Sequence, residues 1–366
     1  MSDQNLIKLT RGNPATEAFP IEEIIECSES ALKRSGDVLL QYHPAAGFLP
    51  LREILAEEAG VEVDQIIVSN GSIQLLGFLV EALLSPDDLV LVERPSYDRT
   101  ITAFRRAGIQ VMGVPIDRDG LNIAILEEVL KRYSPRLLYL IPDFQNPTGV
   151  TMSLAGRKAV LSLADQHDFM LIEDSPYRRL RYTGVDIPTL HQLNSKRVIQ
   201  LSSFSKLLSP GIRVGWMVAP KEIVEQVTQI ATDTYITPSM LSQGIVYEFI
   251  RQGRMPANIE RLKSLYAPRL DRMLTELEAK LSKGDWSRPE GGFFVGLTLP
   301  EGVSGDRLRH QARQQGLVLS DGNGFFADGD GSRFLRLPFC ALNECEIEEA
   351  ITRLTAAIKS TTNMWR

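Results

Sequence analysis

The chain has 366 residues, 43% of them hydrophobic, and this length is sufficient for two domains with substantial cores. Its 46 acidic and 40 basic side chains give a net charge of −6, which argues against nucleic acid or an anionic membrane as the main partner. No apolar run is long enough for a membrane span, and no signal peptide is visible. Three cysteines, Cys27, Cys340 and Cys345, form no disulfide framework or zinc motif, so we expect reduced thiols and a cytoplasmic protein.

Helix-like and strand-like segments alternate between residues 71 and 220. Helical spacing covers 72–84, 97–107, 123–132 and 154–166, and the expected strands are 89–92, 109–114, 137–141, 169–172, 198–201 and 214–218. This alternation predicts an α/β fold with a mostly parallel sheet and helices on both faces. Ligands of such sheets bind beyond the carboxyl ends of the strands.

The sequence changes character after about residue 255. A long amphipathic helix is expected at 258–281, followed by strands near 291–298, 317–319 and 334–337 and a final helix at 344–358. We therefore expect three parts. An N-terminal segment, residues 1–42, joins the small lobe; a large domain spans 43–254; and a smaller α/β domain spans 255–366.

Lys206 stands just past an expected strand, in the stretch SSFSKLLSPGIRVGW (202–216). A lysine is usually a surface residue, but this one lies among serines and close in sequence to Arg213. Desolvation and a nearby positive charge both lower the pKa of an ammonium group. A partly neutral amine is suited to capturing a carbonyl carbon.

Other residues after strand ends suit an aldehyde cofactor with a ring nitrogen, a ring oxygen and a phosphate. Asp174 could keep a pyridine nitrogen protonated, while Tyr177 and Asn146 could hydrogen-bond the ring oxygen. Taken alone, Asp174 is more often a cap and Asn146 a plain Asn-Pro turn. Tyr97, in RPSYD, could stack on a planar cofactor, and without the others it is equally a core tyrosine.

An anion site is predicted at NGSIQ (70–74), where a helix begins. Exposed backbone amides at a helix N-terminus and the Ser72 hydroxyl attract a phosphate. Ser203 and Ser205 add hydroxyl donors, and Arg213 adds a charge-assisted pair. The phosphate would offset the repulsion between Arg213 and Lys206.

These motifs resemble those of the class I and II aminotransferases, pyridoxal-phosphate enzymes of fold type I, and look closest to the aminoadipate and kynurenine aminotransferase branch. The matching stretches run in family order from residue 11 to 339 and include RGNP, NGSIQ, RPSYD, FQNPTG, EDSPY, SSFSKLLSPGIRVGW, PEGGFFVGL and FLRLPF. The resemblance implies that Lys206 forms a Schiff base with pyridoxal 5'-phosphate and moves the substrate proton. It also implies that the enzyme moves an amino group between an L-amino acid and a 2-oxo acid.

The resemblance assigns roles to further residues. Asp174 would pair with the ring nitrogen, Tyr97 would stack on the ring, and Asn146 and Tyr177 would bind its oxygen. The phosphate cup would comprise Gly71, Ser72, Gln74, Ser203, Ser205 and Arg213. Arg336 would clamp the substrate carboxylate, and Gly12 lies in the segment that closes over substrate. Tyr42 would reach the phosphate of a neighbouring subunit, which implies a homodimer with shared active sites.

Two alternatives remain open on the sequence. The same lysine and electron sink serve elimination, replacement or cyclisation on an amino acid in specialised biosynthesis. A cofactor-binding regulatory domain is the second, although a DNA-binding module would normally precede one and the chain begins almost directly at RGNP.

The run SDGNGFFADG (320–329) resembles a dinucleotide-binding motif, but no helix is expected after it, so a loop is predicted. The four histidines show no metal-like spacing.

Overall fold

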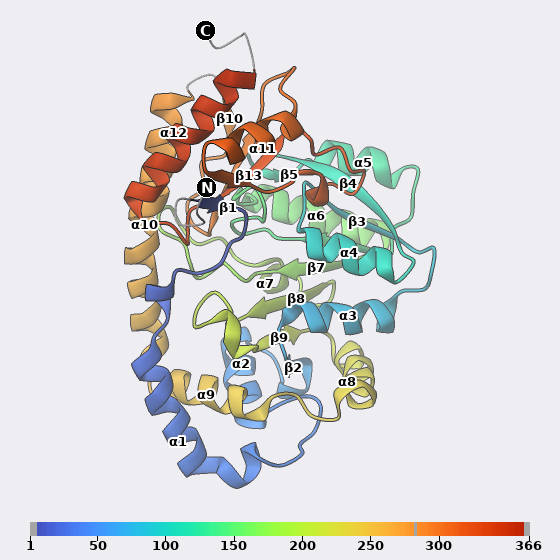
Figure 1. Ribbon diagram of the computed structural model, residues 1–366. Coiled ribbons are helices and arrows are strands. Elements are labelled where there is room, and N and C mark those ends of the chain that lie inside the picture. The colour runs from blue at the N-terminus through green and yellow to red at the C-terminus, as the bar shows by residue number, and fades with distance from the viewer. Residues whose placement is uncertain (1–5, 282–283, 362–366) are drawn as a thin grey trace.

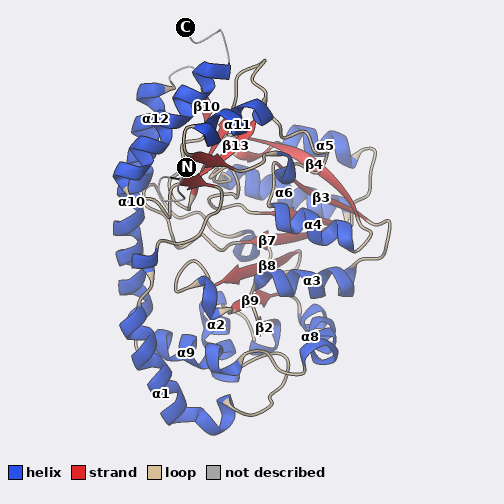
Figure 2. Cartoon of the chain, viewed as in Figure 1, coloured by secondary structure: helices blue, strands red, loops and turns tan. Residues whose placement is uncertain are grey.

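The computed structural model describes residues 6–281 and 284–361, and its centre is an eight-stranded sheet. The strand order is β2-β9-β8-β7-β6-β3-β4-β5 (Figures 1 and 2). Neighbours from β8 to β4 are parallel, whereas β9 and β2 at one edge and β5 at the other join antiparallel pairs. The predicted mostly parallel sheet is therefore confirmed. The strands are β2 (Ile66–Ser69), β3 (Leu89–Arg94), β4 (Gln110–Asp117), β5 (Gly120–Leu121), β6 (Leu137–Leu140), β7 (Met170–Asp174), β8 (Val198–Ser203) and β9 (Gly215–Val218).

Helices cover both faces of this sheet because alternate strand residues point to opposite sides. On β3, Val90 and Val92 pack toward one face and Leu91 toward the other. The first face is covered by α3 (Ser72–Leu83), α4 (Asp98–Arg106) and α8 (Lys221–Tyr235), and the second by α5 (Ile123–Leu130) and α6 (Leu154–His167). The strands are apolar on both faces, as a sheet buried between helices requires.

A smaller lobe packs above this sheet in the view of Figure 1. Its antiparallel sheet has the order β10-β11-β13, and β1 pairs in parallel with β12 beside it. The first strand of the chain thus joins the C-terminal lobe. The elements are β1 (Ile7–Leu9), β10 (Asp285–Trp286), β11 (Phe294–Thr298), β12 (Leu317–Leu319), β13 (Phe334–Pro338), α11 (Gly305–Gln314) and α12 (Glu344–Thr361).

One long helix, α10 (Arg254–Lys280), runs along the side of the molecule and packs on α12 (Figure 1). At the other end of the molecule, α1 (Ile21–Leu39) packs along α9 (Met240–Arg251), near α2 (Leu49–Ala59). The domain boundaries at residues 42 and 254 stay predictions. In the part of the chain described, no helix combines the length and the apolar character that crossing a membrane requires.

The register of the central strands explains where the site lies. Asp174 at the end of β7 is opposite Leu201 of β8, and Glu173 is opposite Leu140 of β6. The loops that follow β6, β7 and β8 therefore leave the same edge of the sheet. These loops carry Asn146, Tyr177 and Lys206.

Candidate active site

Two adjoining cavities lie at this edge of the sheet. The first has a volume of about 180 Å³, and its walls include Ser72, Asp174, Ser203, Ser205 and Arg213. The second, of about 370 Å³, extends toward the small lobe and the N-terminal segment. Both cavities are lined by Tyr97, Asn146, Tyr177 and Lys206. They therefore form one site with two halves, the first facing the large sheet and the second facing Arg336 and Gly12.

Lys206 occupies the boundary between the two halves. Its Nζ donates to the carbonyl oxygen of Gly12 at 3.0 Å and lies 5.6 Å from the ring centre of Phe293. Burial lowers the pKa of this amine, and the positive charges of Arg336 and Arg213 lower it further. The direction expected from the sequence is confirmed, with burial as the leading cause.

Asp174 ends β7 and is only 5% exposed. The Tyr139 hydroxyl donates to Oδ2 of Asp174 at 2.6 Å, whereas Oδ1 has no hydrogen-bond partner. Burial raises the pKa of the Asp174 carboxyl to about 6, and the bond from Tyr139 opposes this rise. Because a buried acceptor without a donor is unfavourable, the free oxygen is ready for a donor from a ligand.

Two tyrosines, Tyr97 and Tyr177, line both cavities together with Lys206. Tyr97 precedes α4 as its N-terminal cap residue, and burial raises its pKa to about 12. The ring of Tyr177 packs edge-on against Phe294 at 5.7 Å and tilted against Phe293 at 5.5 Å, and burial raises the pKa of its hydroxyl as well. Both hydroxyls therefore stay protonated near neutral pH and serve as hydrogen-bond donors.

Arg336 enters the second cavity from β13 and is 8% exposed. Its Nη1 donates to Oδ1 of Asn146 at 3.0 Å, and its Nη2 donates to the carbonyl oxygen of Thr10 at 2.7 Å. Its Nε is buried without a partner. A guanidinium has only donors, so this contact directs the carbonyl end of the Asn146 amide toward Arg336 and leaves its NH₂ group for another acceptor.

The start of α3 forms the anion-binding end of the first cavity. The first amides of a helix have no acceptor within the helix, and here they face Ser203, Ser205 and Arg213. Gly71 has a φ of +106°, and a side chain there would overlap the Arg213 guanidinium. Arg213 donates to the carbonyl oxygen of Asn70 at 2.8 Å, which holds it across the start of the helix.

Three of the predicted residues, Gly71, Gln74 and Tyr42, do not line either cavity. The side chain of Gln74 accepts from the Ser69 hydroxyl at 2.9 Å, so it braces the turn before α3. Tyr42 is 75% exposed and lines a separate surface hollow with Leu40 and Thr237. Within one chain, Tyr42 therefore belongs to the surface.

The N-terminal segment closes the second cavity with its backbone. The carbonyl oxygens of Thr10, Gly12 and Asn13 accept from Arg336, Lys206 and the Cys340 thiol, respectively. Gly12 lies so close to Phe294 that a side chain there would overlap the ring. Gly12 lines the second cavity, and its contact with Phe294 explains why a glycine stands at this position.

Comparisons with known proteins agree with this geometry. Residues 4–354 match the family of class I and II aminotransferases. A 2-aminoadipate transaminase of Thermus thermophilus is 37% identical over 370 residues, covering 97% of this chain and 93% of that protein. The crystal structure of α-aminoadipate aminotransferase LysN from Thermus thermophilus, with N-(5'-phosphopyridoxyl)-L-leucine, has a TM-score of 0.93 at 36% identity and covers 98% of this chain and 93% of that one. Pyrococcus horikoshii kynurenine aminotransferase has a TM-score of 0.94 at 35% identity, covering 97% and 91%.

The chain belongs to the class I and II aminotransferases, pyridoxal-phosphate enzymes of fold type I. Within them it is a member of the aminoadipate and kynurenine aminotransferase branch. It is an enzyme that moves an amino group between an amino acid and a 2-oxo acid, and its relatives favour this outcome over elimination, replacement or cyclisation.

The residues present fit pyridoxal 5'-phosphate. The cofactor needs an amine for its aldehyde, an anion for its ring nitrogen and donors for its phosphate. Lys206, the unpaired Oδ1 of Asp174 and the start of α3 meet these needs within one cavity. In the described residues, no group of three or more His, Cys, Asp or Glu side chains is arranged to hold a metal ion.

The sequence did not reveal Tyr139, whose hydroxyl holds Asp174. A single tyrosine in the otherwise aliphatic strand LLYL was the available signal. It also did not reveal the wall of the second cavity formed by Phe294 and Phe325, whose ring centres lie 4.9 and 4.6 Å from the guanidinium carbon of Arg336. Phe294 lies on β11 and Phe325 ends a short 3-10 helix, so their approach to Arg336 depends on the tertiary fold.

Proposed function

We propose that Lys206 binds the aldehyde of pyridoxal 5'-phosphate covalently and transfers the α-proton of the substrate during transamination. The observation that carries this proposal is the unpaired Oδ1 of Asp174 in the cavity that also holds Lys206. When bound, the cofactor supplies a carbon that is attacked by amines and a ring that withdraws electrons. The remaining chemistry belongs to side chains of this protein.

Lys206 suits the role of a general base because its pKa is lowered by burial and by two arginines. A lowered pKa increases the neutral fraction of this amine at a given pH, and the neutral form can accept a proton. The Gly12 carbonyl accepts a hydrogen bond from Nζ and keeps it at the boundary of the two cavities. General acid–base transfer of this kind contributes roughly 10²–10⁴-fold to the rate.

Asp174 holds a proton on the ring nitrogen in this proposal. Its carboxyl has a pKa of about 6, so it is ionised at neutral pH and attracts a protonated nitrogen. Asn146 and Tyr177 donate to the ring oxygen, and Tyr97 packs against the ring. Ser72, Ser203, Ser205 and Arg213 bind the phosphate together with the backbone at Gly71, and Gln74 supports that turn from behind.

The second cavity binds the substrate. Arg336 offers its unpaired Nε and its two-donor edge to the α-carboxylate, which matches carboxylate geometry. Arg11 and Arg99 line the same cavity, and so do Asp321 and Asp98, which lies 3.9 Å from Arg99. Arg11 supports an amino acid with a distal carboxylate as the donor, as the name of the 2-aminoadipate relative also indicates.

A panel of donors and acceptors tests this assignment. The cofactor absorbance should change when 2-aminoadipate or glutamate is added and return when a 2-oxo acid follows. Kynurenine and leucine should react with lower kcat/KM. Irreversible release of ammonia would instead indicate elimination, and equal rates for all donors would contradict a cationic side-chain site.

We also propose a homodimer with shared active sites. Large apolar side chains are exposed around Tyr42 and along α1, among them Ile21, Leu40 and Ile236. A monomeric protein rarely exposes several large apolar side chains close together, and such a patch usually marks an interface with another protein. A cytoplasmic location belongs to the same proposal and rests on the three unpaired thiols.

Mixed subunits test whether the sites are shared. Lys206→Ala and Tyr42→Ala homodimers should each have low activity. After subunit exchange, one site of each mixed dimer contains both native residues, so activity should return to about one quarter of the wild-type value if subunits mix at random. No recovery, despite mixed dimers detected by mass spectrometry, would mean that Tyr42 does not serve a neighbouring site.

A further inference from the structure

A buried carboxylate lies behind the residues proposed to bind the ring oxygen. Asp143 is 0% exposed and lines neither cavity, yet it precedes Asn146 by only three positions. Its Oδ1 accepts from Nη2 of Arg157 at 2.8 Å, and its Oδ2 accepts from Nη1 of Arg157 at 3.2 Å. Both oxygens are thus held by one guanidinium in a two-point contact, the strongest geometry for such a pair.

Arg157, on α6, is itself fully buried and uses all five of its N–H groups. Besides the two bonds to Asp143, it donates to the carbonyl oxygens of Met152, Pro142 and Pro188 at 3.1, 3.2 and 3.1 Å. A guanidinium with every donor paired cannot shift without losing a bond. Arg157 therefore fixes Asp143 against the helix.

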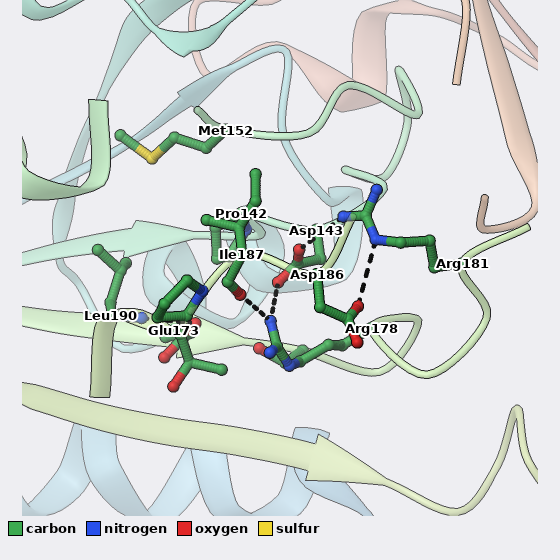
Figure 3. Close-up of polar contacts among 12 residues, drawn as sticks. Pro142, Asp143, Met152, Glu173, Arg178, Arg181, Asp186, Ile187 and Leu190 are labelled. Atoms are coloured by element: carbon green, nitrogen blue, oxygen red, sulfur yellow. Dashed lines mark hydrogen bonds and ion pairs between the residues drawn. The ribbon is translucent and has the colours of Figure 1, made fainter. Parts of the chain in front are cut away.

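Two more arginines reach Asp143 from the segment that follows Tyr177. Nη1 of Arg178 lies 3.4 Å from Oδ2 and also donates to the carbonyl oxygen of Ile187 at 2.6 Å (Figure 3). Nη2 of Arg181 lies 3.6 Å from Oδ1. Asp143 therefore links the turn that carries Asn146 to the segment that carries Tyr177.

The backbone between Asp143 and Asn146 needs this support. Phe144 has a φ of +54°, a conformation that is unfavourable for a bulky side chain and persists only where its surroundings impose it. Arg181 packs over the Phe144 ring at 4.8 Å, and Gly292 packs against it from the small lobe. The ion pairs of Asp143 and the packing of Arg181 therefore both restrain the backbone at Phe144.

Other acidic groups lie near the cluster formed by Asp143, Arg157, Arg178 and Arg181, and offset part of its positive charge. Arg181 pairs with Asp186 and Glu290, and Figure 3 shows its side chain directed toward Asp186. Glu173 lies nearby and accepts from the backbone N–H groups of Leu190 and His191. Asp143 is thus the one acidic side chain of the cluster that contacts Arg157, Arg178 and Arg181 together, among the residues that the structure describes.

We propose that Asp143 is a positioning residue, whose anion sets the orientation of Asn146 and Tyr177 and thereby the hydrogen bonds that these two give to the ring oxygen of the cofactor. This inference rests on the proposed function. Donors stabilise an anionic oxygen only over short distances and at favourable angles. Without the anion, Arg157, Arg178 and Arg181 would keep their other partners but lose the one carboxylate that all three share, and the link between the two segments would be lost.

Asp143→Asn tests the inference in the cofactor-loaded enzyme. In this variant, Asn146 and Tyr177 should give weaker hydrogen bonds to the ring oxygen, so the anionic form of this oxygen is less stable. The pH at which the bound chromophore titrates should therefore be about half a unit or more higher than in the wild-type enzyme. We also expect kcat to fall about tenfold, with a smaller change in KM. Asp143→Glu, which restores the anion, should recover part of the shift.

Asp165→Asn is the matched control. It lies on α6, pairs with Arg197 at 3.0 Å and is half exposed, so neither the chromophore titration nor kcat should change. Arg178→Gln is a second variant at a partly exposed site and should shift the titration in the same direction by less. If Asp143→Asn does not fold, the titration of Arg178→Gln tests the role of Asp143 instead.

Two results would overturn the inference: an unchanged titration in folded Asp143→Asn, or, where that variant is unfolded, an unchanged titration in Arg178→Gln. Borohydride trapping of the cofactor on Lys206 separates this failure from a failure of the proposed function. If the cofactor is trapped on Lys206 but the chromophore titration is unchanged in the variant, only the role of Asp143 is refuted. If no cofactor is trapped on Lys206 in the wild-type enzyme, the proposed function is refuted.

Discussion

The Tyr139 hydroxyl donates a hydrogen bond of 2.6 Å to Oδ2 of Asp174 and leaves Oδ1 facing the first cavity without a partner. The two residues lie on neighbouring parallel strands, where Tyr139 pairs in register with Ile172. One oxygen is therefore fixed by the protein while the other stays available. Tyr139, in the core of the sheet, thus influences how Asp174 can bind the ring nitrogen of the cofactor.

Tyr139→Phe should weaken the anion at Asp174. The donor from Tyr139 opposes the rise in the Asp174 pKa, so its loss should raise that pKa further. One hydrogen bond of about 1 kcal/mol corresponds to roughly 0.7 pKa unit. We expect the acid limb of the kcat/KM profile to move upward in pH by this amount. Tyr133→Phe, an exposed tyrosine, is the control, and an unmoved acid limb in Tyr139→Phe would refute this coupling.

Asp174→Asn should stabilise the cofactor-free protein in alkaline solution. The pKa of Asp174 is raised from 3.8 to about 6 on folding, so its ionisation opposes folding. This destabilisation is absent below the unfolded pKa, develops between about pH 4 and 6, and is complete above about 6. We expect a Tm about 2 °C higher than wild type at about pH 8, with no gain at about pH 4.

The same scan on Asp271→Asn, an exposed position on α10, gives the baseline for removing one charge. A stability difference for Asp174→Asn that grows as the pH falls would show that the buried carboxyl has the opposite effect.

Arg336→Lys should impair substrate binding far more than cofactor binding. A lysine cannot reproduce the two-donor edge, and it would also release Oδ1 of Asn146. We expect KM for the amino donor to rise about 100-fold, while the affinity for pyridoxal phosphate stays within about threefold. Arg333→Lys, on the loop just before β13, should leave both constants unchanged. An unaltered KM in Arg336→Lys would exclude a carboxylate clamp at this position.

Gly71→Ala should weaken binding of the phosphate. The added methyl group would overlap the Arg213 guanidinium, and the residue has a φ of +106°. Gly60→Ala is a matched control because its φ is also positive, at +68°, while nothing lies near the added methyl group. We expect Gly71→Ala to raise the Kd for pyridoxal phosphate at least about tenfold and Gly60→Ala to affect stability alone. Equal Kd values for both variants would mean that Arg213 does not bind the phosphate.

Much of the fold could be predicted from the sequence because the periodic segments are long and strongly apolar. The helix predicted at 72–84 is α3 (Ser72–Leu83), and the strand predicted at 317–319 is β12 (Leu317–Leu319). The antiparallel direction of β9 could not be predicted, because the apolar pattern of a strand is the same in either direction. Helices α8 (Lys221–Tyr235) and α9 (Met240–Arg251) were not predicted, although Val224, Val227 and Ala231 of α8 have the spacing of a buried helix face.

The site was predictable where motifs follow strand ends. Because β6, β7 and β8 are parallel neighbours, the residues that follow their ends, Asn146, Asp174 and Lys206, line one cavity. Tyr139 and Asp143 could not be assigned in this way, because their partners lie 35 and 14 positions away and depend on how strands and helices pack. The wall residue Phe325 likewise reaches Arg336 only through the fold of the small lobe.

Reduction with borohydride, followed by peptide mass spectrometry, identifies the lysine that binds the cofactor. The purified enzyme, supplied with pyridoxal 5'-phosphate and reduced, should carry a single stable phosphopyridoxyl group on the peptide that contains Lys206. Lys206→Ala should carry none and should not turn over amino acids. Labelling of a different lysine, or turnover by Lys206→Ala at the wild-type rate, would show that Lys206 is not the catalytic lysine.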